Sequence, residues 1–255
     1  MSKAGAYSTM KRIIGLTALP LTLALAACGS SDEAKTADAT SSAAPIAAPA
    51  GQSWVDTITQ TDEGGFVMGN PNAPIKLVEY ASLTCSHCAE FADKGVAALK
   101  EKYISKGTVS LELRNYVRDP IDMTAALLSR CGGTGPYFQL TEQMFAAQSE
   151  WLNRFQSLGE EGFKRIQSLP PAQQFGELAK AGQLDQFVQQ RGVSSQKAAQ
   201  CLADKAAVDK LVAMNKKATE EYNLTGTPMF MINGQVVPDT AAWEALEPKL
   251  RAAGA

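Results

Sequence analysis

Two cysteines three residues apart stand where a predicted strand passes into a predicted helix. The run 75–81 (IKLVEYA) is almost continuously apolar, which is typical of a central strand buried on both faces. After 85–88 (CSHC), apolar residues recur at three- and four-residue steps, which predicts an amphipathic helix ending at Gly107. The segment 109–117 alternates and predicts a second strand. Strand, helix and strand in this order imply a parallel pair with a right-handed crossover.

The rest of the chain predicts a long helical stretch and a second group of strands. Helical periodicity dominates from about 121 to 222. The stretch 226–237 predicts a strand, an Asn-Gly turn and a strand. We expect a terminal helix to begin at Asp239 or Thr240, and Pro248 to kink or end it. The fold class is therefore α/β, with helices inserted between two groups of strands.

The N-terminal residues 1–27 predict a secretory signal rather than structure. Three basic residues precede the mostly apolar run 13–24, which is shorter than the roughly 20 residues that a membrane span needs. The sequence Leu25-Ala26-Ala27-Cys28 resembles the bacterial lipobox, so we expect Cys28 to carry lipid. The protein would then be a membrane-anchored lipoprotein facing the periplasm. The alternative is a plain signal peptide in which Cys28 is incidental.

The segment 28–52 is dominated by Ala, Ser, Thr, Pro and Asp. Such a composition buries too little apolar surface to offset the entropy of ordering the chain, which predicts a disordered tether. The folded part is expected to begin near Ser53.

Charge and histidine content exclude several classes of protein. The formal net charge is −2, without the basic footprint of a nucleic-acid-binding protein, so we expect no nucleic acid as partner. His87 is the one histidine of the sequence. A multi-histidine metal site is excluded, as is a hydrolase triad that does not use His87.

The position of the Cys85–Cys88 pair favours redox chemistry. A thiolate at a helix N-terminus meets unpaired backbone N–H groups and the positive end of the helix dipole. Cys85 would be that thiolate and nucleophile, Cys88 would face inward as the resolving thiol, and His87 would add a cation or hydrogen-bond donor. A zinc site would need Cys131 and Cys201 as further ligands, and their helical setting speaks against it.

The order strand, Cys-x-His-Cys, helix, helical insertion, then Gly226-Thr227-Pro228 and a strand resembles the DsbA-like branch of the thioredoxin superfamily. The resemblance implies a thioredoxin-like fold with an inserted all-helical domain. Its core halves would span 53–118 and 223–255, and the helical insertion 119–222. It also implies thiol:disulfide exchange through Cys85 and Cys88, without a cofactor.

Further site residues follow from the same resemblance. Pro228, in the cis form and preceded by Thr227, would face the cysteine pair, and the Thr227 backbone would pair with an extended substrate. Glu79 would be a buried acid that relays a proton to Cys88 through water. The alternatives for Glu79 are a solvated gap or a pair with Arg114.

The resemblance leaves the direction of exchange open. Oxidation of cysteine pairs in unfolded exported proteins, by a monomer that a membrane redox partner resets, is the leading hypothesis. Ser86 before His87, and Thr227 before the proline, depart from the best-known oxidases, so isomerase or reductase activity is an alternative. A Cu(I)-binding thiol protein using Met229 and Met231 is another, and a redox-inactive binding module is a third.

Two cysteines remain outside the motif. Cys131 and Cys201 both lie on apolar helix faces, and the signal peptide implies an oxidising compartment in which thiols tend to pair. We therefore expect a structural disulfide between them. The alternative is two separate buried thiols.

Overall fold

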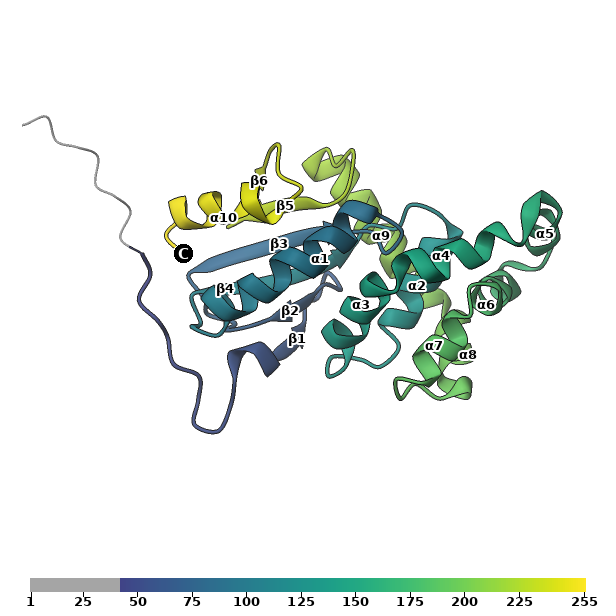
Figure 1. Cartoon of the computed structure of the whole chain (residues 1–255), viewed down its shortest axis with the longest axis horizontal. Helices are drawn as coiled ribbons and strands as arrows, with labels where there is room; N and C mark the ends of the chain where they lie inside the picture. Colours follow the sequence, from purple (N-terminus) through teal and green to yellow (C-terminus); the bar gives the residue numbers. More distant parts are fainter. Residues whose placement is uncertain (1–41) are drawn as a thin grey trace, which may run out of the picture. The chain divides into compact units, whose positions relative to one another are not determined.

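The computed structural model describes residues 42–255, so the predicted signal peptide and Cys28 lie outside the described residues. A six-stranded sheet runs through the fold in the order β1-β2-β4-β3-β5-β6 (Figure 1). Only the neighbouring strands β3 and β4 are parallel, and every other pair is antiparallel. The strand bounds are β1 Ile58–Gln60, β2 Phe66–Met68, β3 Ile75–Ala81, β4 Val109–Asn115, β5 Met229–Ile232 and β6 Gln235–Val237.

The predicted strand–helix–strand unit is confirmed as β3, α1 (Ser86–Leu99) and β4. A five-residue π-helical turn, η2 (Lys100–Ile104), continues α1 towards β4. The register places Leu77 opposite Leu111 in the parallel pair, and both are buried. Because helices cover both faces of β3, its residues show the near-continuous apolar run of a central strand.

Opposite faces of the sheet have different helical covers. Apolar residues of α1 and of α10 (Trp243–Ala252) belong to one core cluster with Leu77 and Ala81 of β3. Met214 and Ala218 of α9 (Lys205–Tyr222) pack with alternate residues of β3 in a second cluster. The alternation of side chains along a strand therefore decides which residues of β3 face α1.

Helices α2 to α9 stand between β4 and β5 in the chain; α2 to α8 lie beside the sheet in space, and α9 returns over one of its faces (Figure 1). Helix α2 is buried along nearly its whole length and packs against α3, α6, α7, α8 and α9, so it forms the centre of this helical part. The bounds not yet given are α2 Pro120–Ser129, α3 Tyr137–Ala146, α4 Gln148–Gln156, α5 Gly159–Gln167, α6 Pro171–Ala181, α7 Leu184–Gln189 and α8 Ser195–Leu202.

The terminal helix differs from its prediction. Helix α10 begins at Trp243 rather than at Asp239 or Thr240, because Asp239 adopts a left-handed backbone and the Thr240 hydroxyl bonds the Pro238 carbonyl. Pro248 lies inside the helix and does not end it. Pro248 and its turn face solvent, so water can satisfy the carbonyl that a proline leaves unbonded, while the buried face holds the helix on the core.

Residues 42–52 also differ from the predicted disordered tether. The Ala43 N–H donates to the Gly254 carbonyl at 2.7 Å, and the Ile46 N–H donates to the Lys106 carbonyl at 2.8 Å. The Ile46 carbonyl in turn accepts from the Trp54 indole at 2.7 Å. A side chain at Gly107 would collide with that carbonyl, and its φ of +70° also favours glycine. Backbone hydrogen bonds, which composition does not reveal, thus order this segment.

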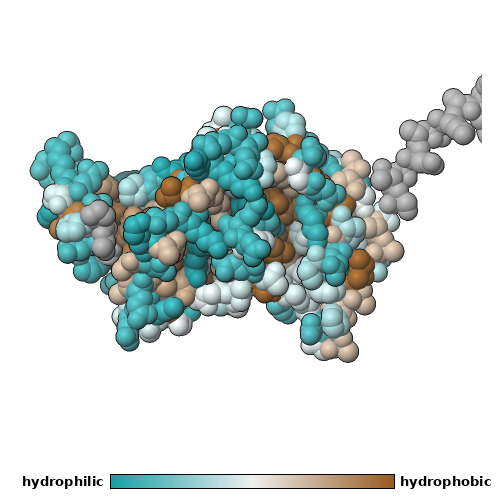
Figure 2. Space-filling model, turned by 180° about the vertical axis from the view of Figure 1, so that it is seen from behind, coloured by the Kyte–Doolittle hydropathy of each residue, from teal (hydrophilic) through white to brown (hydrophobic). Residues whose placement is uncertain are grey.

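Few large apolar side chains are exposed in the described part of the chain. The face opposite to the view of Figure 1 shows hydrophobic residues in small areas between hydrophilic ones (Figure 2). Among residues 42–255, the large apolar side chains that are exposed are Ile46, Val212 and Val236. No helix in this part of the chain has both the length and the apolar content needed to cross a bilayer.

Candidate active site

Cys85 is the N-cap residue of α1. Its backbone is extended (φ −93°, ψ 121°), and its carbonyl accepts the Ala89 N–H at 3.1 Å, so the first turn of the helix begins under its side chain. Cys85 is only 5% exposed, and its Sγ lies 3.2 Å from the Thr227 carbonyl oxygen, to which it donates when it is protonated. The loop before β5 therefore meets the start of α1 at this sulfur.

Hydrogen bonds to Cys85 outweigh the cost of burying a charge there. A hydrogen bond from the Cys88 thiol is the largest effect, and the Thr227 side chain and the backbone N–H groups of Cys88 and His87 add to it. Together they lower the pKa of Cys85 from the ordinary 9.0 to about 5, although burial raises it. At pH 7 the thiolate fraction rises from about one in a hundred to nearly all.

Cys88 has the opposite environment. It is fully buried one turn into α1, and both thiols are free. Burial first, then its hydrogen bond to Cys85 and the charges of Glu79 and Cys85, raise the pKa of Cys88 above its ordinary value. The pair is therefore asymmetric at neutral pH, with a thiolate at Cys85 and a protonated thiol at Cys88.

Glu79 lies on the α1 face of β3 and is 3% exposed. Burial first, and then the charge of Cys85, raise the pKa of Glu79 to about 8, so its carboxyl holds a proton at pH 7. The alternative pair with Arg114 is not formed. Arg114 instead bonds Glu112 at 2.8 Å and Glu63 at 2.6 Å. A buried, protonated acid thus stands close enough to both cysteines to influence their titration.

Thr227 and Pro228 complete the site from the other side. The peptide bond between them is cis. The Thr227 Oγ1 is buried and has no hydrogen-bond partner within the described chain while Cys85 is a thiol. Its hydroxyl is therefore available to donate a hydrogen bond to the Cys85 thiolate. A cavity of about 460 Å³ extends from these residues between the loop 222–229 and the segment 236–241.

The side chain of His87 is exposed beside this group. Its side chain is 69% exposed, and its Nδ1 lies 3.9 Å from the Glu90 carboxylate. The contribution of His87 to the Cys85 environment comes from its backbone N–H. Within residues 42–255, no group of three or more His, Cys, Asp or Glu side chains is arranged to hold a metal ion.

Two residues of the helical insertion hold the loop before Cys85, and no sequence signal singled them out. Asp122 of α2 accepts the Ser82 hydroxyl at 2.6 Å and the Leu83 N–H at 2.8 Å. Gln148 of α4 donates from Nε2 to the carbonyls of Leu83 and Cys85 at 2.8 and 2.9 Å. Apart from the Ser82 hydroxyl, their partners in this loop are backbone groups, and all of them are far away in sequence, so neither spacing nor composition could reveal them.

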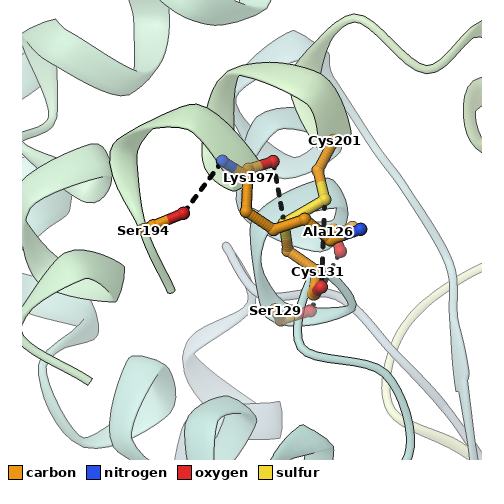
Figure 3. The surroundings of a disulfide bond; sticks show 6 residues. All are labelled: Ala126, Ser129, Cys131, Ser194, Lys197 and Cys201. Atoms are coloured by element: carbon orange, nitrogen blue, oxygen red, sulfur yellow. Dashed lines mark hydrogen bonds between the residues drawn. A yellow bond between two sulfur atoms is a disulfide. The ribbon is translucent and has the colours of Figure 1, made fainter. Parts of the chain in front are cut away.

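Cys131 and Cys201 form a disulfide that joins the residues after α2 to α8 (Figure 3). Their Cα atoms are 5.7 Å apart across a sequence separation of 70 residues. Lys197 lies beside the bridge, with its carbonyl 3.3 Å from the Cys131 sulfur. This second pair belongs wholly to the helical part and is separate from the group around Cys85.

Comparison with known proteins identifies the family. A thioredoxin family model matches residues 61–251. The chain belongs to the thioredoxin family. Its fold within that family is DsbA-like, which confirms the fold class expected from the sequence, with helices inserted into a thioredoxin-like core.

Solved structures of the family cover most of the described chain. A protein-disulfide isomerase from Novosphingobium aromaticivorans is 33% identical with a TM-score of 0.70, and the match covers 73% of this chain and 95% of that one. A variant of alpha-DsbA1 from Wolbachia pipientis is 26% identical with a TM-score of 0.55, over 68% of this chain and 76% of that one.

A curated relative from Rickettsia bellii bears the name protein-disulfide oxidoreductase. It is 29% identical over 176 residues, which is 68% of this chain. The match spans 58% of the relative's own length.

Proposed function

We propose that this protein is a thiol:disulfide oxidoreductase whose reactive sulfur is Cys85. The observation that carries the proposal is the asymmetry of the pair: hydrogen bonds lower the pKa of Cys85 to about 5, while burial raises that of Cys88. Only a thiolate is a nucleophile or a good leaving group in disulfide exchange. The names of the Novosphingobium and Rickettsia relatives support the same chemistry.

Exchange in the oxidising direction starts from a Cys85–Cys88 disulfide. A substrate thiolate attacks the Cys85 sulfur, so a mixed disulfide forms and Cys88 leaves with the electron pair of the broken bond. Glu79, which is protonated at pH 7, gives its proton to Cys88, directly or through water. A second substrate thiolate then attacks the substrate sulfur, and Cys85 leaves as a stabilised thiolate. The substrate gains a disulfide, and the protein holds two reduced cysteines.

The low pKa of Cys85 favours oxidation of other proteins over their reduction. A thiolate whose pKa lies two units below pH 7 stabilises the reduced pair about a hundredfold, which corresponds to roughly 60 mV. The more stable the reduced pair, the more readily the oxidised pair gives its disulfide away. We therefore propose an oxidase of cysteine pairs.

The substrate class follows from the Thr227 side of the site. The Thr227 carbonyl lies at the Cys85 sulfur, and the cavity of about 460 Å³ continues from it. An extended, unfolded segment that follows this loop would bring its own sulfur to Cys85 while its backbone pairs with Thr227, a mode known as β-augmentation. Pro228 would fix the shape of the loop, and His87, exposed beside the pair, would contact the incoming chain.

We further propose that this chemistry takes place outside the cytoplasm. The lipobox-like sequence supports lipid on Cys28 and an anchor on a membrane facing the periplasm. Its partners there would be unfolded exported proteins with cysteines, and a membrane redox partner that reoxidises the pair. The protein would act as a monomer. Mass spectrometry of the N-terminal peptide tests the lipid, and an unmodified N-terminus beyond position 28 would contradict it.

A specific observation keeps isomerase activity as the second candidate. The Novosphingobium relative, which matches at 33% identity, is described as a protein-disulfide isomerase. Isomerisation also needs a nucleophilic Cys85, but the reduced rather than the oxidised pair begins the reaction.

Two ribonuclease assays test the proposed direction. The oxidised protein is mixed with reduced ribonuclease, and the reduced protein with scrambled ribonuclease, and recovery of ribonuclease activity is followed in both. We expect fast oxidation and weak unscrambling, with both lost in Cys85→Ser. Strong unscrambling with poor oxidation would assign the protein as an isomerase, and no exchange in either assay would refute an oxidoreductase.

A further inference from the structure

The segment 82–85 connects β3 to α1 and holds Cys85 at the helix start. Side chains of two helices from the insertion hold this segment from opposite sides of its backbone. Asp122 in α2 accepts the Leu83 N–H, and Gln148 in α4 donates to the Leu83 carbonyl. Leu83 thus has both of its backbone polar groups bonded to side chains of the inserted helices.

Gln148 is the more direct of the two contacts, because it also donates to the carbonyl of Cys85 itself. It is the first residue of α4 and is buried at 7% exposure. Each hydrogen of its terminal amide goes to one carbonyl, at 2.8 and 2.9 Å, so the donor capacity of Nε2 is fully used. A side chain that makes two buried hydrogen bonds to one loop restricts the backbone of that loop.

Asp122 holds the other side of the segment and ties it to the end of β4. Its carboxylate accepts the Ser82 hydroxyl, the Leu83 N–H and the Arg118 N–H at 2.6 to 3.0 Å. Its backbone N–H is in turn bonded by the side chain of Asp119, the N-cap of α2. Asp122 is therefore itself fixed by the start of its helix.

We propose that Gln148 and Asp122 are positioning residues that hold Cys85 where its thiolate receives its hydrogen bonds. The inserted helical domain would thereby set the oxidising strength of the cysteine pair. This inference rests on the proposed function and deepens it, because it assigns to the insertion a role in the reactivity of Cys85.

The physical reason is that the reduced pair depends more on the exact position of the Cys85 sulfur than the oxidised pair does. The Cys85 thiolate accepts from the N–H groups of His87 and Cys88, and such charge-assisted bonds weaken quickly as distance and angle depart from ideal. A disulfide sulfur carries no charge to stabilise. Loosening the segment 82–85 therefore disfavours the reduced pair more than the oxidised pair, which makes the protein a weaker oxidant.

The test removes the two donors of Gln148 while keeping the length of its side chain. Gln148→Met is made in the Cys88→Ser background, and the pKa of Cys85 is read from thiolate absorbance against pH. The same substitution in the otherwise unchanged protein is equilibrated with glutathione. The matched control is Gln156→Met, at the exposed end of the same helix, where the amide bonds only Asn153 among the described residues.

We expect Gln148→Met to raise the pKa of Cys85 by about 0.5 to 1 unit relative to Gln156→Met. The equilibrium with glutathione should move by about three- to tenfold towards a weaker oxidant. Gln148→Asn, whose shorter side chain pulls the donors away, should act in the same direction and serves if the methionine variant does not fold. Asp122→Ala, which removes the hydrogen bonds to the Ser82 hydroxyl and to the Leu83 and Arg118 N–H groups, should raise the pKa of Cys85 as well, because the Asp122 carboxyl, with a pKa of about 6, is largely uncharged where Cys85 titrates.

Either variant of Gln148 that folds but leaves the pKa of Cys85 within 0.2 unit of the control would overturn the positioning role. Failure of the proposed function gives a different result. In that case the unchanged protein would not exchange disulfides with glutathione at all, although the absorbance titration would still report the pKa of Cys85.

Discussion

The molecule carries two pairs of cysteines with opposite states. Cys85 and Cys88 are free thiols three residues apart at the start of α1. Cys131 and Cys201 are bonded to each other across 70 residues of the helical part. The first pair is surrounded by hydrogen-bond donors to one sulfur and a buried acid near the other, whereas the second pair links two helical segments. Reactivity follows from what surrounds the sulfurs, and not from the presence of two cysteines in reach of each other.

The largest expected difference between the pairs is in activity. Cys85→Ser should reduce disulfide exchange to the uncatalysed rate, because no other thiolate lies at the helix start. The double variant Cys131→Ala/Cys201→Ala should keep exchange within a few-fold of the unchanged protein. Oxidation of reduced ribonuclease measures both. Loss of exchange in the folded double variant would remove the distinction between a reactive and a structural pair.

The free energy of unfolding should show the opposite: the Cys131–Cys201 pair should matter more than the Cys85–Cys88 pair. The Cys131–Cys201 bridge closes a loop of 70 residues, which on the loop-entropy model stabilises the fold by about 4 kcal/mol at most. The double alanine variant should therefore lose about 2 to 4 kcal/mol of unfolding free energy in a denaturant titration. Cys85→Ser in the reduced protein serves as the comparison at pH 4, below the pKa of Cys85, where the thiolate no longer contributes to stability. An unchanged midpoint in the double variant would show that the bridge does not restrict the unfolded chain.

The stability of the reduced protein should depend on pH through Cys85, whereas the bonded cysteines Cys131 and Cys201 do not titrate. The folded pKa of Cys85, about 5, lies below its unfolded value near 9. The stabilisation by the thiolate is therefore fully present above pH 9 and is lost as pH falls through 5. Thiolate absorbance in Cys88→Ser, whose hydroxyl replaces the Cys88 thiol as a donor to Cys85, should show a midpoint well below 9, and exchange with glutathione should slow below that midpoint. A midpoint at or above about 8 would refute a stabilised thiolate.

Glu79 makes stability depend on pH in the opposite direction to Cys85. Its folded pKa of about 8 lies above the ordinary 4.5, so stability relative to a neutral side chain falls as pH rises from 4.5 to 8. Glu79→Gln should be more stable than the unchanged protein at pH 7, by on the order of 3 kcal/mol, and nearly equal to it at pH 4.

Urea titrations at pH 4, 5.5 and 7 measure this effect. Glu142→Gln, which removes a half-buried carboxylate paired with Lys100, is the control and should not gain stability with pH. A Glu79→Gln variant that is less stable at pH 7 than at pH 4, relative to the unchanged protein, would mean that Glu79 is ionised in the fold.

The predictable parts of this molecule are those whose signal is local. Strand β3, helix α1 and the motif between them follow from periodicity and from four adjacent residues. Strands β1 and β2 were missed because three residues each are too short to show alternation. The contacts of Asp122 and Gln148 join segments 39 to 65 residues apart and need the folded chain. A tertiary hydrogen bond to the backbone leaves no pattern in the sequence.

The docked segment 42–52 has a consequence for orientation. It bonds Lys106, just before β4, and the C-terminal residues, whereas Cys85 follows the far end of the parallel strand β3. Seven strand residues span roughly 20 Å, so the two points lie at opposite poles of the sheet. Residue 42, where the described chain begins, therefore lies at the pole of the sheet away from the reactive sulfur. A substrate chain that reaches Cys85 therefore approaches the pole of the sheet opposite to the docked segment 42–52.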